Sequence, residues 1–334
     1  MRGRGERLEE AALAAARDAA RIRTSRIATL AIVGGAVVVL FVVGWLTTPQ
    51  FLQWPNLRNV VRSAAMIGMI ALGMTFITLS GNFFSLSVAQ TGAFSAIAFA
   101  FMMSWGWPLP LALLAVLAGA LLVGAAQGGL VALGGNPIVV TLGVGAGLFG
   151  LGSVLTDNKT IRHGNTAADW MGTGRPLGIP TQTWAFIILC IIAAIVLSRT
   201  RFGRNVLFVG GNKFAAASSG IRPSRVAIQV FAISAFAASI AGLFLSAQFG
   251  EGRLDSFTGD DINAIAAILV GGAALQGGEG SPLRTALGAV FIAALENLMV
   301  LRQYAFGVRK LWVGVAILVA VSLFNYLRSR ARTT

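Results

Sequence analysis

The fold is decided by a stretch that begins SAAMIGMIALGMTFITLSG (residues 63–81) and ends LGVGAGLFGLGSVLT (residues 142–156). Between Arg62 and Asp157 the chain runs for 94 residues without a single Asp, Glu, Lys or Arg. A soluble domain carries about 25 % charged residues, which cover its exposed faces. Without charged residues, this stretch cannot form a water-exposed surface, so its environment must be lipid. One membrane-spanning helix needs roughly 20 apolar residues. The sequence therefore predicts a polytopic membrane protein in which this stretch crosses the bilayer about four times.

The composition of the whole chain agrees with a helical membrane protein. Of its 334 residues 56 % are hydrophobic and 11 % are charged, and the mean hydropathy is +0.78. The apolar runs are continuous, whereas the strands of a membrane barrel alternate apolar and polar residues. The 41 glycines suit close helix packing in lipid. We therefore expect an all-α bundle, and we attribute the net charge of +14 to basic cytoplasmic loops rather than to nucleic-acid binding.

Residue types that carry chemistry are scarce. The only cysteine, Cys190, lies in an apolar run, and the only histidine, His163, lies in a polar loop. An intrachain disulfide is excluded by that count, and neither residue alone makes a metal site or a catalytic centre. We therefore expect neither an enzyme nor a cofactor or metal in this chain.

The apolar runs predict about ten membrane segments, and any number of spans from eight to ten is compatible with them. The glycine-interrupted segment 262–277 is the least regular, and a full span and a segment that dips into the membrane both fit it. Tight turns are expected at Trp105–Pro110 and Gly134–Pro137. The segments are 27–47, 64–80, 86–105, 109–132, 137–156, 182–198, 226–248, 262–277, 285–301 and 310–327.

The distribution of basic residues predicts that both termini are cytoplasmic. With the N-terminus inside, 17 Lys and Arg fall on the cytoplasmic side and nine on the other side. Residues 1–26 hold seven Arg in a helical pattern without a cleavage site, which indicates an uncleaved cytoplasmic helix at the membrane surface. The transmembrane domain then covers residues 27–330, with a large outer loop at 157–181 and a large inner loop at 199–225.

The inner loop 199–225 carries six basic residues and no acid, and topology anchoring alone accounts for such charge. The order of residues in this loop also predicts a short helix over 213–219. Asn212 is placed to cap the start of that helix, and Gly220 is placed to end it. A short helix between two spans on the cytoplasmic face is suited to receiving force from a soluble partner, although an ordinary surface turn has the same residue types.

Four segments together resemble the permeases of the ribose-type ABC importers, a family that moves monosaccharides. The resemblance extends from about residue 47 to 327. It is carried by ALGMTFITLSG (71–81), GRPLGIPT (174–181), DDINAIAAILVGGAALQGGEGSP (260–282) and the inner-loop pattern TRFGRNVLFVGGNKFAAASSGI (200–221). In that family the inner loop holds the helix that docks onto the ATPase. The resemblance thus implies coupling roles for Arg204, Gly210, Gly211, Asn212, Lys213, Ala215, Ala216, Ser219 and Gly220.

The resemblance also implies partners and a location. It implies a cytoplasmic ATPase subunit that binds ATP and Mg²⁺, a periplasmic or surface solute-binding protein, and a second permease copy that is identical or homologous. The expected location is the bacterial inner membrane. This chain has no G-x-x-x-x-G-K-[ST] phosphate loop, in agreement with ATP hydrolysis on a separate subunit.

One departure from the family pattern falls inside the charge-free stretch. Where the family has an intramembrane Asp after the second span, this chain reads SGNFFSLSVAQ (80–90), which is two residues longer, with Ser85 at the place of the Asp. Conversely, Glu296 lies in a span where the family usually has Asn, as a lone carboxylate that either faces a path or reaches the outer interface. The residues expected to line a polar conduit are Asn82, Ser85, Ser87, Gln90, Glu296 and Asn297.

Two other classes remain as alternatives. A secondary transporter driven by an ion gradient needs intramembrane acids or histidines, and only Glu296 qualifies. An integral membrane enzyme needs a cluster of such groups at one face, which the sequence does not offer. Two GxxxG spacings, Gly124–Gly128 and Gly143–Gly147, are suited to pack helices within or between subunits, and we expect packing within the subunit.

Overall fold

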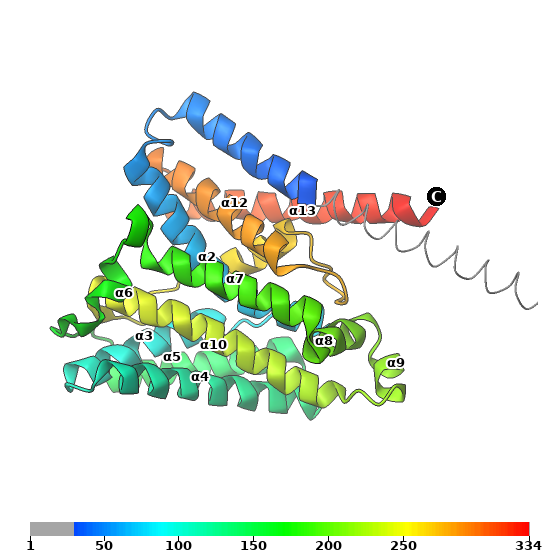
Figure 1. Cartoon of the computed structure of the whole chain (residues 1–334), viewed down its shortest axis with the longest axis horizontal. Helices are drawn as coiled ribbons and strands as arrows, with labels where there is room; N and C mark the ends of the chain where they lie inside the picture. Colours follow the sequence, from blue (N-terminus) through cyan, green and yellow to red (C-terminus); the bar gives the residue numbers. More distant parts are fainter. Residues whose placement is uncertain (1–29, 334) are drawn as a thin grey trace, which may run out of the picture.

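The computed structural model describes residues 30–333, with side chains up to residue 323. The expected N-terminal helix 1–26 lies outside these residues. The described part is all-α, as predicted, apart from one small antiparallel pair in which β1 (Ile161–Arg162) contacts β2 (Glu251–Gly252). The fold is therefore a helical bundle whose large loops are folded rather than extended (Figure 1).

Eight described helices are long and apolar enough to cross a membrane, as judged by length and composition. Two further segments, α3 (Val88–Ser104) and α11 (Asp260–Val270), are shorter. The eight are a first span (Leu30–Thr47), α2 (Trp54–Leu79), α4 (Leu109–Ala132), α5 (Pro137–Thr156), α7 (Thr181–Arg199), α10 (Pro223–Phe249), α12 (Pro282–Leu301) and α13 (Phe306–Thr333). The loops carry η1 (Thr166–Ala168), α6 (Asp169–Thr173), η2 (Pro176–Gly178), α8 (Arg201–Gly211) and α9 (Lys213–Ser218).

The second span begins ten residues earlier than predicted. The expected start at residue 64 was wrong because it treated Arg58 and Arg62 as loop residues. The helix begins at Trp54, with Pro55 in its first turn, where proline needs no hydrogen-bond partner. Its 26 residues span about 39 Å, longer than the roughly 30 Å hydrocarbon core. The first turns therefore extend toward the interface, where arginine side chains are tolerated.

The segment 262–277 is not a continuous span. Its helix α11 has 11 residues, and it ends where Gly271 and Gly272 follow Val270. Gly272 takes a left-handed conformation (φ 74°), and Ala273 N donates to Ile268 O, which closes the last turn. Residues 271–281 continue as turns to the end of α2, where Gly278 N donates to Leu79 O at 2.9 Å. The first half of this segment is therefore helical and the second half is not.

Two helices form the centre of the bundle. Helix α2 packs against α7, α10, α11 and α12, and helix α10 packs against α3 and α4 as well. Figure 1 shows α10 running along α4, with α2 and α12 side by side on the other side of α7. The remaining long helices expose apolar side chains such as Leu122, Val154 and Leu318. Exposed apolar faces of this extent suit lipid and not water.

The two GxxxG spacings have different roles. Gly124 and Gly128 of α4 lie directly against the backbone of α10, so the predicted packing within the subunit is confirmed for this pair. Gly143 and Gly147 of α5 have no neighbour near the position of a Cβ atom among the described residues. Packing within the subunit is therefore wrong for the second pair, because that face of α5 points away from the bundle.

Adjacent glycines of α4 give a direct test of this packing. A Cβ atom at Gly128 would lie 2.5 Å from Ile228 Cα, whereas Gly129 has open space. We expect Gly128→Ala to lower the free energy of unfolding by about 1–3 kcal/mol through overpacking, and Gly129→Ala to leave it unchanged or higher. Thermal unfolding in detergent measures both; equal stability of the two variants would contradict the close α4–α10 contact.

Candidate functional site: the inner loop and the polar membrane segment

The inner loop folds into two short helices. Asn212 caps α9 as predicted, since its Oδ1 accepts from Phe214 N and Ala215 N at 3.0 Å. Gly220 follows the helix in a left-handed conformation (φ 81°), the predicted C-cap geometry. The Phe214 side chain is 87 % exposed, although it is a large aromatic group. Helix α9 therefore presents an apolar side chain on a surface that the other described residues leave uncovered.

Helix α8 was missed by the sequence analysis. Thr200 caps it by accepting from Gly203 N at 3.1 Å. Val206 and Val209 are buried against the ends of α2, α7 and α10, while Arg204 is exposed. The signal was present in the spacing of Val206 and Val209 between basic residues, which is typical of an amphipathic helix. Helix α8 therefore fixes α9 to the transmembrane bundle.

The segment after α2 leaves the helical conformation inside the bundle. Ser85 Oγ lies 3.0 Å from Ser87 Oγ, which in turn donates to Gln127 Oε1 of α4 at 2.9 Å. Leu86 N donates to the hydroxyl of Thr141 in α5 at 3.1 Å. These groups are neutral, and Ser85 and Ser87 are both buried. The position of the family's Asp is thus occupied by a chain of hydroxyl and amide groups.

Gln127 is a site residue that the sequence analysis did not name. Its side chain is 2 % exposed, and its Nε2 has no hydrogen-bond partner among the described residues. The Oε1 of Gln90, which the sequence analysis did name, is also without a partner in the described structure. Gln127 is the only amide side chain within α4, and such a group in a membrane span is itself a functional signal.

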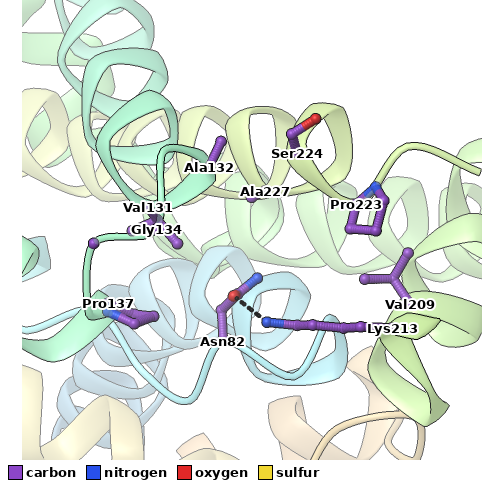
Figure 2. A pocket seen from close by; sticks show the side chains of 11 residues that line it. Asn82, Val131, Ala132, Gly134, Pro137, Val209, Lys213, Pro223, Ser224 and Ala227 are labelled. Carbon is purple, nitrogen blue, oxygen red and sulfur yellow. Dashed lines mark hydrogen bonds between the residues drawn. The ribbon is translucent and has the colours of Figure 1, made fainter. Parts of the chain in front are cut away.

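A cavity of about 300 Å³ opens beside this segment. Figure 2 shows Lys213 of α9 reaching across it toward Asn82, with the α4–α5 turn on one side and the start of α10 above. Lys213 Nζ donates to Asn82 Oδ1 at 3.2 Å, and Asn82 Nδ2 donates to Ser80 Oγ at 2.8 Å. The lining residues are Asn82, Val131, Ala132, Gly134, Gly135, Pro137, Val209, Lys213, Pro223, Ser224 and Ala227.

Glu296 is not a lone carboxylate, so that part of the sequence analysis was wrong. Its Oε1 accepts from Lys310 Nζ at 2.8 Å, and its Oε2 accepts from Asn263 Nδ2 at 3.2 Å. Lys310 lies in α13 and packs back onto α12. Asn263 also donates to Asp260 Oδ1, and Gly259 takes the N-cap position of α11.

Asn297 takes part in a helix–helix contact. Its amide group exchanges hydrogen bonds of 2.8 and 3.0 Å with the amide of Asn56 in α2. The six residues expected to line a conduit therefore fall into two groups. Asn82, Ser85, Ser87 and Gln90 lie around the start of α3, whereas Glu296 and Asn297 lie near the end of α12, beside the start of α2. Within the described part of the chain, no hydrogen bond joins a residue of one group to a residue of the other.

Comparison with known proteins gives a consistent picture. The model of the family "branched-chain amino acid transport system / permease component" matches residues 56–324. The chain is 36 % identical to the probable ABC transporter permease protein YphD of Escherichia coli, over 85 % of this chain and 86 % of that protein. It is 32 % identical to the ribose import permease protein RbsC of Haemophilus influenzae, over 88 % and 93 %.

The name of a further relative gives a different solute. The chain is 33 % identical to the autoinducer 2 import system permease protein LsrC of Salmonella paratyphi B, over 80 % of this chain and 77 % of that protein. No solved structure matches the chain. The relatives are therefore permease proteins of transporters, and the two whose names give a solute differ in it.

The ion pair between α12 and α13 generates a prediction. Both side chains are about one-fifth exposed, so Glu296→Gln and Lys310→Gln are expected to show an interaction energy of about 1–2 kcal/mol in a double-mutant cycle of unfolding. The exposed pair Lys159 and Asp157 is the matched control, and its cycle is expected to give less than about 0.5 kcal/mol. Strict additivity at Glu296 and Lys310 would show that the contact contributes no stability.

Proposed function

We propose that this chain, which belongs to the permease component family of ATP-binding-cassette importers, carries a monosaccharide or a related polyol across the bacterial inner membrane. The family and the eight apolar helices make it a multi-pass membrane permease and not an enzyme. The identity of the solute as a sugar or polyol is the proposed part, and the similarity to ribose permeases supports it.

The neutral polar segment is the observation that carries the choice of solute. A sugar presents hydroxyl groups, which neutral donors and acceptors recognise by hydrogen bonds. Ser85, Ser87 and Gln127 form such a set, and Gln90 and Gln127 each keep an atom without a partner among the residues that the structure describes. A zwitterionic amino acid calls for charged partners, because an unpaired charge in a membrane interior is costly. The segment therefore favours a neutral polyol over an amino acid.

ATP and Mg²⁺ bind a separate cytoplasmic subunit in this proposal. Helix α9 is the docking element, since Phe214 projects from it and Ala215, Ser219 and Gly220 lie on the same exposed turn. An exposed aromatic side chain is a typical anchor of an interface. The basic residues around it, including Arg204, are suited to an acidic rim on the partner. Both termini and this loop are cytoplasmic in the proposal.

The remaining parts of the importer follow from the family. A second permease copy completes a central path, and a periplasmic or surface solute-binding protein delivers the solute. ATP binding draws the α9 helices of the two copies together, and hydrolysis releases them, which alternates access to the path. An ion-coupled mechanism is disfavoured because Glu296, its one intramembrane acid candidate, is paired with Lys310.

Reconstituted transport tests the proposal. The chain is co-expressed with the ATPase and binding protein encoded beside it, purified in detergent and placed in proteoliposomes. We expect a stable complex and ATP-dependent uptake of ribose or another polyol, with no uptake of leucine. Ser87→Ala is expected to lower uptake about tenfold, by loss of hydrogen bonds to the solute or to Gln127.

Ser239→Ala is the matched control, because Ser239 is equally buried but its hydroxyl has no partner in the described structure. Full uptake by this variant is expected. ATP-independent uptake without a complex would refute the importer mechanism. Leucine uptake without sugar uptake would refute the choice of solute alone.

A further inference from the structure

Three stretches of backbone that are distant in sequence meet at one point of the bundle. They are the end of α2 with Gly81, the end of α8 at Gly210 and Gly211, and the turn 276–278 of the broken segment. A Cβ atom on Gly210 would overlap the carbonyl oxygen of Leu79 and lie 2.6 Å from Gly278 N. The end of α8 thus lies in backbone contact with both non-helical segments of the bundle, 80–87 and 271–281.

The two non-helical segments also contact each other there. Gly278 N donates to Leu79 O at 2.9 Å. A Cβ atom on Gly277 would lie 2.7 Å from Gly81 Cα and 3.0 Å from Gly210 O. Gly81 and Gly277 both have left-handed φ values, of 75° and 92°, which residues with side chains rarely adopt. We call Gly81, Gly210, Gly277 and Gly278 the glycine junction.

A polar contact lies beside the junction. Lys213, the first residue of α9, donates to Asn82, the residue after Gly81. Both residues line the cavity of about 300 Å³ (Figure 2). Helices α8 and α9 thus touch the segment 80–87 twice, once by backbone and once by a side chain that crosses open space.

Backbone contacts of this kind transmit displacement with little loss. Flexible side chains absorb small shifts by changing rotamer, but two backbones in van der Waals contact have no such freedom. A shift of α8 toward the bundle therefore displaces both segments at once, whereas the long helices around them are held by extensive packing. The segment 80–87 leads into Ser85 and Ser87, the proposed solute contacts.

We propose that Gly210 is a positioning residue, through which movement of α8 and α9 is passed directly into the two non-helical membrane segments. This inference rests on the proposed function, since it needs an ATPase that moves α9. It separates two glycines that the sequence resemblance treated alike. Gly210 lies in the junction, whereas Gly211 has no neighbour near its Cβ position among the described residues. In this proposal α9 docks onto the ATPase, and Gly210 transmits the movement of α8 and α9 to the membrane segments.

Two adjacent substitutions test the role. Gly210→Ala separates α8 from Leu79 and Gly278, and Gly211→Ala adds the same methyl group in open space. We expect both variants to form the complex with the ATPase. In Gly210→Ala, uptake per ATP hydrolysed is expected to fall about tenfold, a loss of coupling, with hydrolysis retained. Gly211→Ala is expected to match the original chain.

The ratio of uptake to hydrolysis separates transmission from ordinary packing. A purely structural role of Gly210 would lower complex yield, hydrolysis and uptake together and leave their ratio unchanged, which would overturn the inference. Full coupling in Gly210→Ala would overturn it as well. Failure of the original chain to bind the ATPase is a different result, because it refutes the proposed function itself.

A measurement on the original chain covers the case in which Gly210→Ala does not fold. Hydrogen exchange is compared between the nucleotide-free complex and the complex trapped with ATP and vanadate. We expect peptides covering 78–87 and 272–281 to change protection together with 206–211. Changes confined to α9, with both membrane segments unaltered, would overturn the inference.

Discussion

Lipid offers no hydrogen bonds to a polypeptide, so every backbone amide and carbonyl inside the membrane must find its partner within the protein. This constraint makes the long segments helical and makes any departure from a helix costly. The described residues depart from a helix within the bundle at 80–87 and at 271–281, and in both places a backbone amide bonds to a neighbouring helix. Gly278 N bonds Leu79 O of α2, and Leu86 N bonds the Thr141 hydroxyl of α5. The two breaks also lie against each other, where Gly277 approaches Gly81.

The position of these breaks explains why α2 and α10 are central. Helix α2 leads into the first break, and its Thr75 hydroxyl lies 3.0 Å from that of Thr285, four residues after the second break ends. Helix α10 supports α3, which follows the first break, through close contacts such as Gly92 with Gly242. Irregular backbone at membrane depth is typical of the solute path of a transporter. The helices that face lipid surround the two non-helical segments and hold them in place.

The sequence predicted what local chemistry determines. Continuous apolar runs located the spans, and Asn212 and Gly220 marked both ends of α9 because caps depend on neighbouring residues alone. It did not predict contacts between distant residues. The pairing of Lys310 with Glu296 depends on how α12 and α13 pack, which local sequence does not record. Gln127 could not be identified as a site residue from the sequence, because its contact is Ser87, which lies 40 positions away in the chain. The early start of α2 was hidden because its two arginines look like a loop.

In the proposed topology, α9 faces the cytoplasm while the loop that carries α6 faces the other side. The chain has one cysteine, Cys190, which is buried, so Cys190→Ala provides a background for single-cysteine labelling. Cysteines at Phe214 in α9 and at Trp170 in α6 replace two exposed side chains. A membrane-impermeant maleimide should label position 214 only in inverted vesicles and position 170 only in right-side-out vesicles. Labelling of both positions from the same side would contradict the account.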